Sequence, residues 1–84
     1  MKNPINKNFT CRGINSAIAL LDSNRYDILR IDILRGGRAE KNPRIKALTS
    51  NHLVYKLEKD QFYKKYNGSR DQGIAVEFYG DLFN

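Results

Sequence analysis

The spacing of apolar residues along the chain predicts four short strands separated by three helices. Alternation of apolar and polar side chains is clearest in residues 26–34 and 73–79, and this period of two is typical of half-buried strands. Apolar residues three and four positions apart in residues 14–24 predict a helix instead. The expected strands cover residues 9–13, 26–34, 52–57 and 73–79, and the expected helices cover residues 14–24, 42–51 and 58–68.

Local signals support the boundaries of these elements. Asn42 followed by Pro43 is typical of a helix start, because asparagine caps the free N–H groups and proline fits the first helical position. Asn15 or Ser16 is the expected cap of the first helix, and residues 35–41 are expected to form a loop. The inward faces give a predicted core of Ile18, Leu21, Leu29, Ile31, Ile33, Leu48, Phe62, Ile74 and Val76.

The alternating order of strands and helices predicts an α/β domain with a four-stranded, mixed or mostly parallel sheet. A chain of 84 residues is long enough for one such domain. We expect a disordered polar tail over residues 1–8, the folded domain over residues 9–79, and the start of a linker over residues 80–84.

Charge is the feature of the composition that bears most on function. The net charge is +6, and residues 1–50 hold ten basic and four acidic side chains, whereas the rest of the chain is balanced. A positive surface of this kind favours a polyanionic partner such as nucleic acid. The alternative is that the charge serves solubility alone.

Several classes of protein are disfavoured. Cys11 is the single cysteine and His52 the single histidine, so neither an internal disulfide nor an ordinary zinc site is expected. No apolar run approaches the roughly 20 residues that a membrane span needs, and the N-terminus has no signal-peptide pattern. We therefore expect a cytoplasmic protein without a metal or membrane partner, and no catalytic set of residues is evident.

Basic residues gather where strands are predicted to join helices. Arg35, Arg38, Lys41 and Arg44 occur within ten residues that follow the second strand, and Arg12 precedes the first helix. Ligands of α/β folds usually meet the loops beyond the carboxyl ends of strands. The sequence "RGGR" at residues 35–38 is also compatible with an RNA-binding Arg-Gly motif, although a flexible turn is an equal interpretation.

Two motifs and the order of elements between them resemble a known domain. "GINSAIALL" at residues 13–21 and "SRDQGIAVEF" at residues 69–78 resemble the N-terminal substrate-binding domain of the SpoU-type RNA 2′-O-ribose methyltransferases, in the SPOUT superfamily. Gly13 and Asn15 match the first motif of that family, and Gln72 and Gly73 match the second. Asp71 stands where the family usually has histidine, and Ala17 where a larger residue is common.

The resemblance implies a three-layer α/β/α sandwich similar to the kink-turn-binding ribosomal proteins. It also implies a separate catalytic domain, absent from these residues, that would bind S-adenosylmethionine and give the parent protein its methyltransferase activity, with a homodimer forming through that domain. No cofactor is expected in the present chain. The expected RNA-binding residues are Arg12, Asn15, Arg35, Arg38, Lys41, Arg44, Arg70 and Gln72.

Two alternatives remain open at this point. Gln72 could bond backbone groups and stabilise its own loop, since amide side chains commonly do so. The chain as a whole could be a protein-interaction domain, or an RNA-binding domain unrelated to methylation, with the basic loops incidental in the first case.

Overall fold

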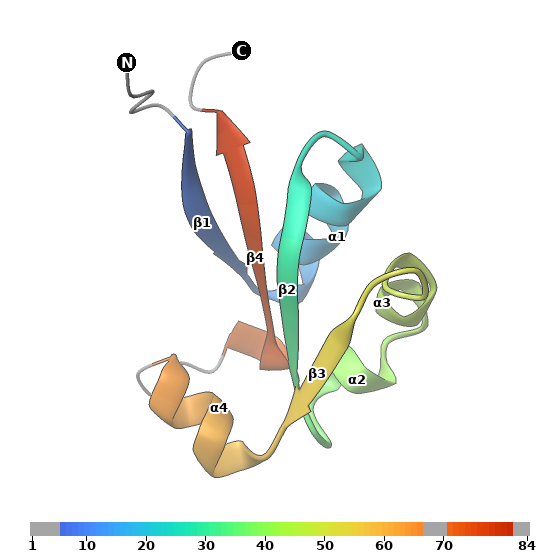
Figure 1. Ribbon diagram of the computed structural model, residues 1–84. Helices are drawn as coiled ribbons and strands as arrows, with labels where there is room; N and C mark the ends of the chain where they lie inside the picture. The colour runs from blue at the N-terminus through green and yellow to red at the C-terminus, as the bar shows by residue number, and fades with distance from the viewer. Residues whose placement is uncertain (1–5, 67–70, 82–84) are drawn as a thin grey trace.

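The computed structural model describes residues 6–66 and 71–81, and its strands form one four-stranded sheet of order β1-β4-β2-β3 (Figure 1). The strands are β1 (Asn6–Arg12), β2 (Asp27–Leu34), β3 (Val54–Leu57) and β4 (Ile74–Asp81). The helices are α1 (Ile14–Ser23), α2 (Arg38–Lys41), α3 (Pro43–Leu48) and α4 (Lys59–Lys65), and a single 3₁₀ turn, η1 (Asp71–Gly73), precedes β4.

The sheet is mixed, and only one of its three strand pairs is parallel. β4 lies between β1 and β2 and is antiparallel to both, while β2 and β3 run parallel. The expectation of a mostly parallel sheet is therefore wrong, and the mixed alternative is confirmed. Helix α4 has seven residues and spans about 10 Å at 1.5 Å per residue. It is too short to carry the chain back along the sheet, so β4 starts at the edge where β3 ends.

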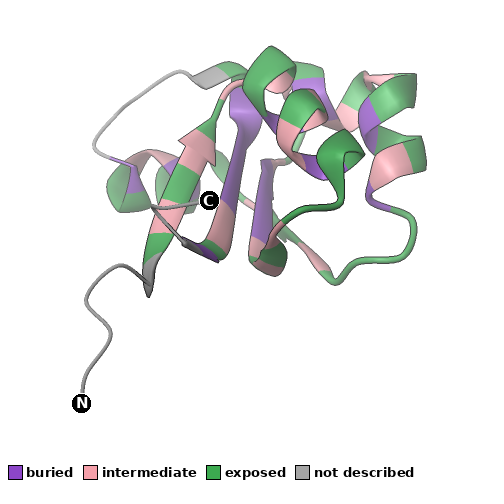
Figure 2. Cartoon of the chain, turned by 90° about the horizontal axis from the view of Figure 1, so that it is seen from above, coloured by how far each residue is buried: buried purple, intermediate pink, exposed green. Residues whose placement is uncertain are grey.

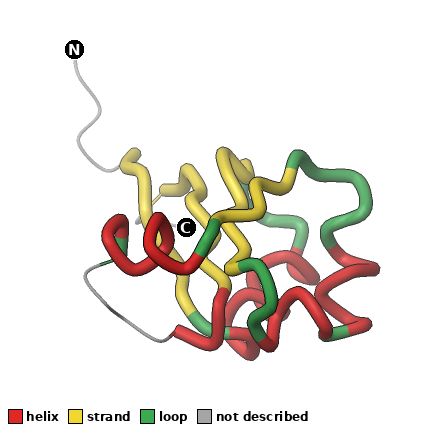
Figure 3. The backbone as a smooth tube through the Cα atoms, turned by 90° about the horizontal axis from the view of Figure 1, so that it is seen from below, coloured by secondary structure: helices red, strands yellow, loops and turns green. Residues whose placement is uncertain are grey.

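Helices lie on both faces of the sheet. α1, α2 and α3 pack together against Ile31 and Ile33 of β2 and against Ile74 and Val76 of β4. α4 packs through Phe62 and Tyr66 against Ala75, which faces the other side. Figure 3 shows the first three helices gathered on one side of the strands and α4 apart from them.

Most of the expected core is buried, and Leu29 is the clear exception. A β-bulge between Ile28 and Arg30 inserts Leu29 as an extra residue, and this residue is 51% exposed. Ile28 contacts the core in its place. Figure 2 shows the buried positions concentrated in the middle of the sheet and on the helix sides that face it. Ile18 and Leu48 are half-buried at the rim of the core, whereas Leu21, Ile31, Ile33, Phe62, Ile74 and Val76 are buried as expected.

Several element boundaries differ from the sequence-based expectation, and α3 and β3 are shorter than expected. Asn42 caps α3 as predicted, since its side-chain oxygen accepts from the backbone nitrogens of Arg44 and Ile45 at 2.8 and 3.1 Å. Residues 38–41 form the short helix α2 rather than continuing the loop. β1 already begins at Asn6 and β4 ends at Asp81, so both strands extend into the segments expected to be tail and linker. No helix among the described residues is long and apolar enough to cross a membrane.

Candidate nucleic-acid interface

Strand directions bring four connections to one edge of the sheet. Because β1 and β2 are both antiparallel to β4, their carboxyl ends lie beside the amino end of β4, and β3 ends at the same edge. In Figure 1 this edge is the lower end of the sheet, where α1 begins and β4 begins. We call residues 12–15, 35–38 and 72–73 the basic edge.

The first and last motifs of the sequence meet at this edge. The backbone nitrogen of Ile14 donates to the Gln72 side-chain oxygen at 2.8 Å, and the backbone nitrogen of Gly13 donates to the Ile74 carbonyl at 3.3 Å. Gly13, not Asn15 or Ser16, is the N-cap of α1 and has no capping side chain of its own. Gln72 therefore supplies the missing cap from the other end of the chain.

Gln72 keeps one hydrogen-bonding group for a ligand. Its oxygen faces the Ile14 N–H, so the other amide atom is the Nε2 donor. Among the described residues Nε2 has no partner, and Gln72 is exposed. Gln72 thus bonds a backbone group, as the alternative interpretation expected, but that group belongs to the start of α1 and not to the loop of Gln72 itself.

The glycines of "RGGR" have structural roles. Gly36 has a φ of +80°, which the turn after β2 requires, and the nitrogen of Gly37 donates to the Leu34 carbonyl at 3.0 Å. Gly73 has a φ of +77°, and a Cβ at that position would lie 3.2 Å from the Leu34 Cβ and 3.6 Å from the Gly37 Cα. The two glycine-containing connections pack against each other, so a turn accounts for this motif without an Arg-Gly RNA-binding role.

The arginines of the basic edge differ in how far their charges are compensated. Arg35 donates from Nε to Glu58 at 2.8 Å, and both side chains are more than half exposed. Arg12 is exposed, and its guanidinium carbon lies 5.4 Å from the centre of the Tyr66 ring. Arg38 is exposed and makes no ion pair with any described residue. Arg38 is therefore the best-placed cation for an external anion.

A hollow of about 370 Å³ opens beside Arg38 and Gln72. Leu34, Gly37, Gly73 and Tyr63 complete its lining. Tyr63 is half-buried and lines this hollow with the part of its side chain that the core leaves exposed. Its position on α4 could have indicated this, because Phe62 and Tyr66 are four residues apart and define the buried face, which leaves Tyr63 at the margin.

The remaining expected site residues are not all brought together. Asn15 lies exposed in the first turn of α1, within the basic edge, and Lys41 is exposed in α2. Arg44 pairs at 3.3 Å with Asp22, near the carboxyl end of α1, so it lies away from the basic edge. Arg70 lies outside the described residues.

A second charged cluster lies beneath α4 and has a structural explanation. Asp32 is fully buried, and its carboxylate accepts from Arg30 at 2.6 Å, from Lys65 at 2.7 Å and from the Tyr66 hydroxyl. Burial alone would raise the pKa of Asp32, but the three hydrogen bonds outweigh burial and hold that pKa below its ordinary value. Burial and the neighbouring carboxylate raise the pKa of Tyr66. Because the Asp32 oxygens are satisfied, this cluster fastens α4 to the sheet.

Metal chemistry has no candidate among residues 6–66 and 71–81, which contain no group of three or more His, Cys, Asp or Glu side chains suited to a metal ion. Cys11 is half-buried against the core, where burial raises the pKa of its thiol. Comparison with protein-family models, with curated proteins and with solved structures found no match to this chain.

Proposed function

We propose that this chain is an RNA-binding module and that the basic edge is its RNA-binding surface. The observation that carries the proposal is the convergence of Arg12, Arg38 and the free Nε2 of Gln72 from three separate connections onto one edge. Cations that converge in this way suit a phosphate backbone, and a polar donor beside them suits a base or a ribose hydroxyl.

The hollow supports a specific mode of contact. Arg38 would bind a phosphate, Tyr63 would stack on a base, and Gln72 Nε2 would donate to an acceptor on that nucleotide. An unpaired nucleotide in a loop or bulge is the chemistry that fits, because its base is free to leave the helical stack. Arg12 and Asn15, on the α1 side, would contact the adjoining backbone.

The finer form of the proposal follows the resemblance to SpoU-type methyltransferases. Helices on both faces of the sheet support the three-layer arrangement and the likeness to kink-turn-binding ribosomal proteins that the resemblance implies. The hydrogen bond between Ile14 and Gln72 also joins the two motifs that match the family. On this proposal the parent protein methylates a ribose 2′-hydroxyl of ribosomal or transfer RNA, and S-adenosylmethionine and the homodimer interface belong to a separate domain.

The RNA surface is tested by titrating a stem-loop RNA at several salt concentrations. Arg38→Ala should weaken binding and make the dependence of log K on log salt shallower by about one unit for each phosphate that the variant no longer binds. Lys64→Ala is the matched control, since Lys64 is an exposed cation on α4 without an ion pair among the described residues. Equal effects of the two substitutions would mean diffuse electrostatic binding and would overturn the proposed surface.

Calorimetric titration with S-adenosylmethionine tests the proposal that the cofactor binds to a separate domain. The chain alone should give no saturable heat of binding, because the cofactor site is assigned to another domain. Saturable binding at micromolar concentration would contradict that assignment and would leave the salt experiment unaffected.

A further inference from the structure

A second hollow of the molecular surface involves other residues of α2, namely Ala39, Glu40 and Lys41. It is an open groove of about 550 Å³ between the edge strand β3 and the helices α2 and α3. We call it the lysine groove. Its floor lies over the buried side chains of Ile33 and Ile45, and Val54, which is half-buried, supplies apolar surface. Three lysines surround it, namely Lys41, Lys46 and Lys56. It exists because the helices of that face stop short of β3, which leaves Val54 half-buried and Lys56 exposed.

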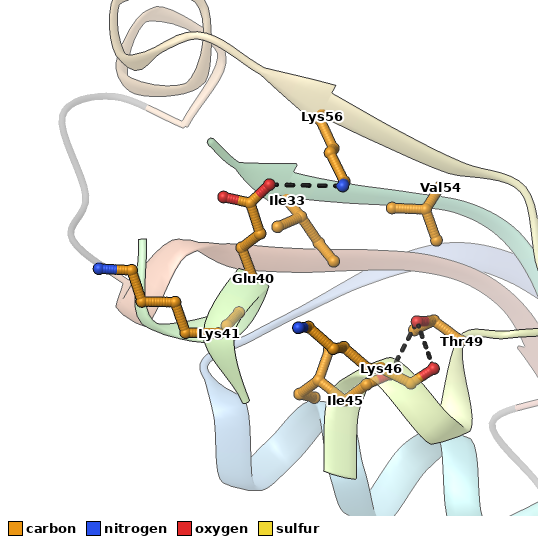
Figure 4. A pocket seen from close by; sticks show the side chains of 9 residues that line it. Ile33, Glu40, Lys41, Ile45, Lys46, Thr49, Val54 and Lys56 are labelled. Carbon is orange, nitrogen blue, oxygen red and sulfur yellow. Dashed lines mark hydrogen bonds and ion pairs between the residues drawn. The ribbon is translucent and has the colours of Figure 1, made fainter. Parts of the chain in front are cut away.

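The balance of charge in the groove is positive. Glu40 is the single acidic residue of the lining and lies 3.4 Å from Lys56. Figure 4 shows these two side chains reaching toward each other from α2 and β3. A hydrogen bond from the Gly36 nitrogen lowers the pKa of Glu40, so the pair stays ionised. Lys41 and Lys46 make no ion pair with any described residue, and two cations are left uncompensated.

The edge of β3 also offers backbone hydrogen-bonding groups. The nitrogen of Arg35 donates to the Leu57 carbonyl at 2.9 Å, so the backbone groups of Leu57 point toward β2. Backbone groups alternate sides along a strand, so those of Val54 and Lys56 point outward. No described residue pairs with these outward groups. The same two residues direct their side chains into the groove, which joins the free edge and the groove into one surface.

We propose that the lysine groove binds an acidic segment of a partner protein, which adds to β3 as an extended fifth strand. The outward N–H and C=O groups of Val54 and Lys56 would pair with the segment, as in other cases of strand addition. Alternate side chains of the segment would then enter the groove, with aliphatic groups on Val54 and carboxylates on the uncompensated Lys41 and Lys46.

Other occupants fit this surface less well. The lining holds no aromatic side chain on which a base could stack, so a nucleic acid would gain charge contacts alone. A second copy of the chain would bring its own Lys56 against the same edge, and lysine in an edge strand disfavours that pairing. An acidic segment would pair with the outward backbone groups of β3 and would also neutralise the lysine charges.

The proposal is tested with a fluorescent peptide of sequence EEEVEVEEE, which presents Glu, Val, Val and Glu on one face of a strand. Anisotropy titration of the intact chain at low salt should show saturable binding, and amide NMR shifts should fall on residues 53–57 and 39–46. Two control peptides separate the contributions. EEEEVVEEE places the valines on opposite faces, and an EEEVEVEEE peptide with methylated backbone nitrogens cannot complete a strand ladder.

Substitutions in the chain complete the test. Lys46→Glu should weaken binding of EEEVEVEEE about fivefold, in line with a partly exposed ion pair, while Lys64→Glu, which makes the same charge change on α4, should weaken it much less. Equal binding of all three peptides, or equal effects of the two substitutions, would overturn the proposal. NMR shifts confined to the basic edge, or an oligouridylate that shifts residues 53–57 more than the peptide does, would also overturn it.

Discussion

The side-chain oxygen of Gln72 accepts a 2.8 Å hydrogen bond from the backbone nitrogen of Ile14, which is 58 positions away in the chain. This bond replaces the side-chain cap that Gly13 cannot provide and links the start of α1 to the start of β4. It also fixes which atom of the Gln72 amide faces outward. The oxygen of Gln72 thus serves the fold, and its nitrogen is the atom that we propose contacts RNA.

The two roles of Gln72 are separable by substitution. Gln72→Ala removes both amide groups and should lower the free energy of unfolding by about 1 kcal/mol, as the loss of a helix cap does. Gln72→Glu keeps an oxygen acceptor for Ile14, and its charge is favourable near a helix N-terminus. Urea denaturation should therefore show Gln72→Glu close to the wild type. On the proposed function, RNA binding should be impaired in both variants. Equal destabilisation by the two substitutions would contradict the capping role.

Gly73 should tolerate a side chain less well than Gly36 does. Both have positive φ angles, so alanine at either position carries backbone strain of about 1 kcal/mol. At Gly73 the added Cβ would also lie 3.2 Å from Leu34, whereas at Gly36 it would meet nothing within 4 Å. Thermal denaturation should show a larger drop for Gly73→Ala. A drop of the same size at Gly36 would mean that the packing between the two connections is unimportant.

Asp32 should make stability depend on acid pH. Its pKa is lowered in the folded chain, so its contribution is fully present above the unfolded-state pKa of about 4 and is lost as the pH falls through the folded value. Asp32→Asn should cost about 2–3 kcal/mol at neutral pH and should flatten the loss of stability below about pH 4. Glu77→Gln, which alters a half-exposed partner 3.2 Å from Lys65, is the control and should do less. Parallel pH profiles for wild type and Asp32→Asn would contradict this role.

Because of the bulge in β2, alanine substitution of two nearby aliphatic residues should reduce stability by very different amounts. Ile31→Ala should cost about 2–5 kcal/mol, because Ile31 is fully buried in the main core. Leu29→Ala should change the unfolding free energy by less than about 0.5 kcal/mol, because Leu29 is 51% exposed at the bulge. Denaturant unfolding of both variants tests the strand register. Comparable losses of unfolding free energy would mean that Leu29 is part of the core.

Local patterns in the sequence predict the elements that depend on local physics. Asn42 and Pro43 predict the start of α3, and the alternation of apolar and polar residues predicts β2 and β4. The convergence of Arg12 and Arg38 on one edge was also predictable, because both follow strands. A bulge leaves no such signal, and Leu29 was misplaced for that reason.

These local patterns could not predict contacts between segments that are distant in the sequence. Asp32 interrupts an apolar strand, and nothing nearby indicates that Lys65 and Tyr66, more than thirty residues later, will bury and pair it. Arg44 was grouped with the basic edge by sequence proximity, but α3 carries it to Asp22. The free Nε2 of Gln72 likewise depends on a partner at Ile14.

Amide NMR mapping of a bound stem-loop RNA tests the central claim most directly. RNA binding at the basic edge predicts that the largest shifts fall on residues 12–15, 35–38 and 72–73 and on Tyr63, which lines the adjoining hollow. It also predicts that the lysine groove, residues 53–57 in particular, stays unchanged when RNA binds. Shifts spread evenly over all the lysines and arginines, or largest in the groove, would contradict the assignment of the basic edge as the RNA-binding surface.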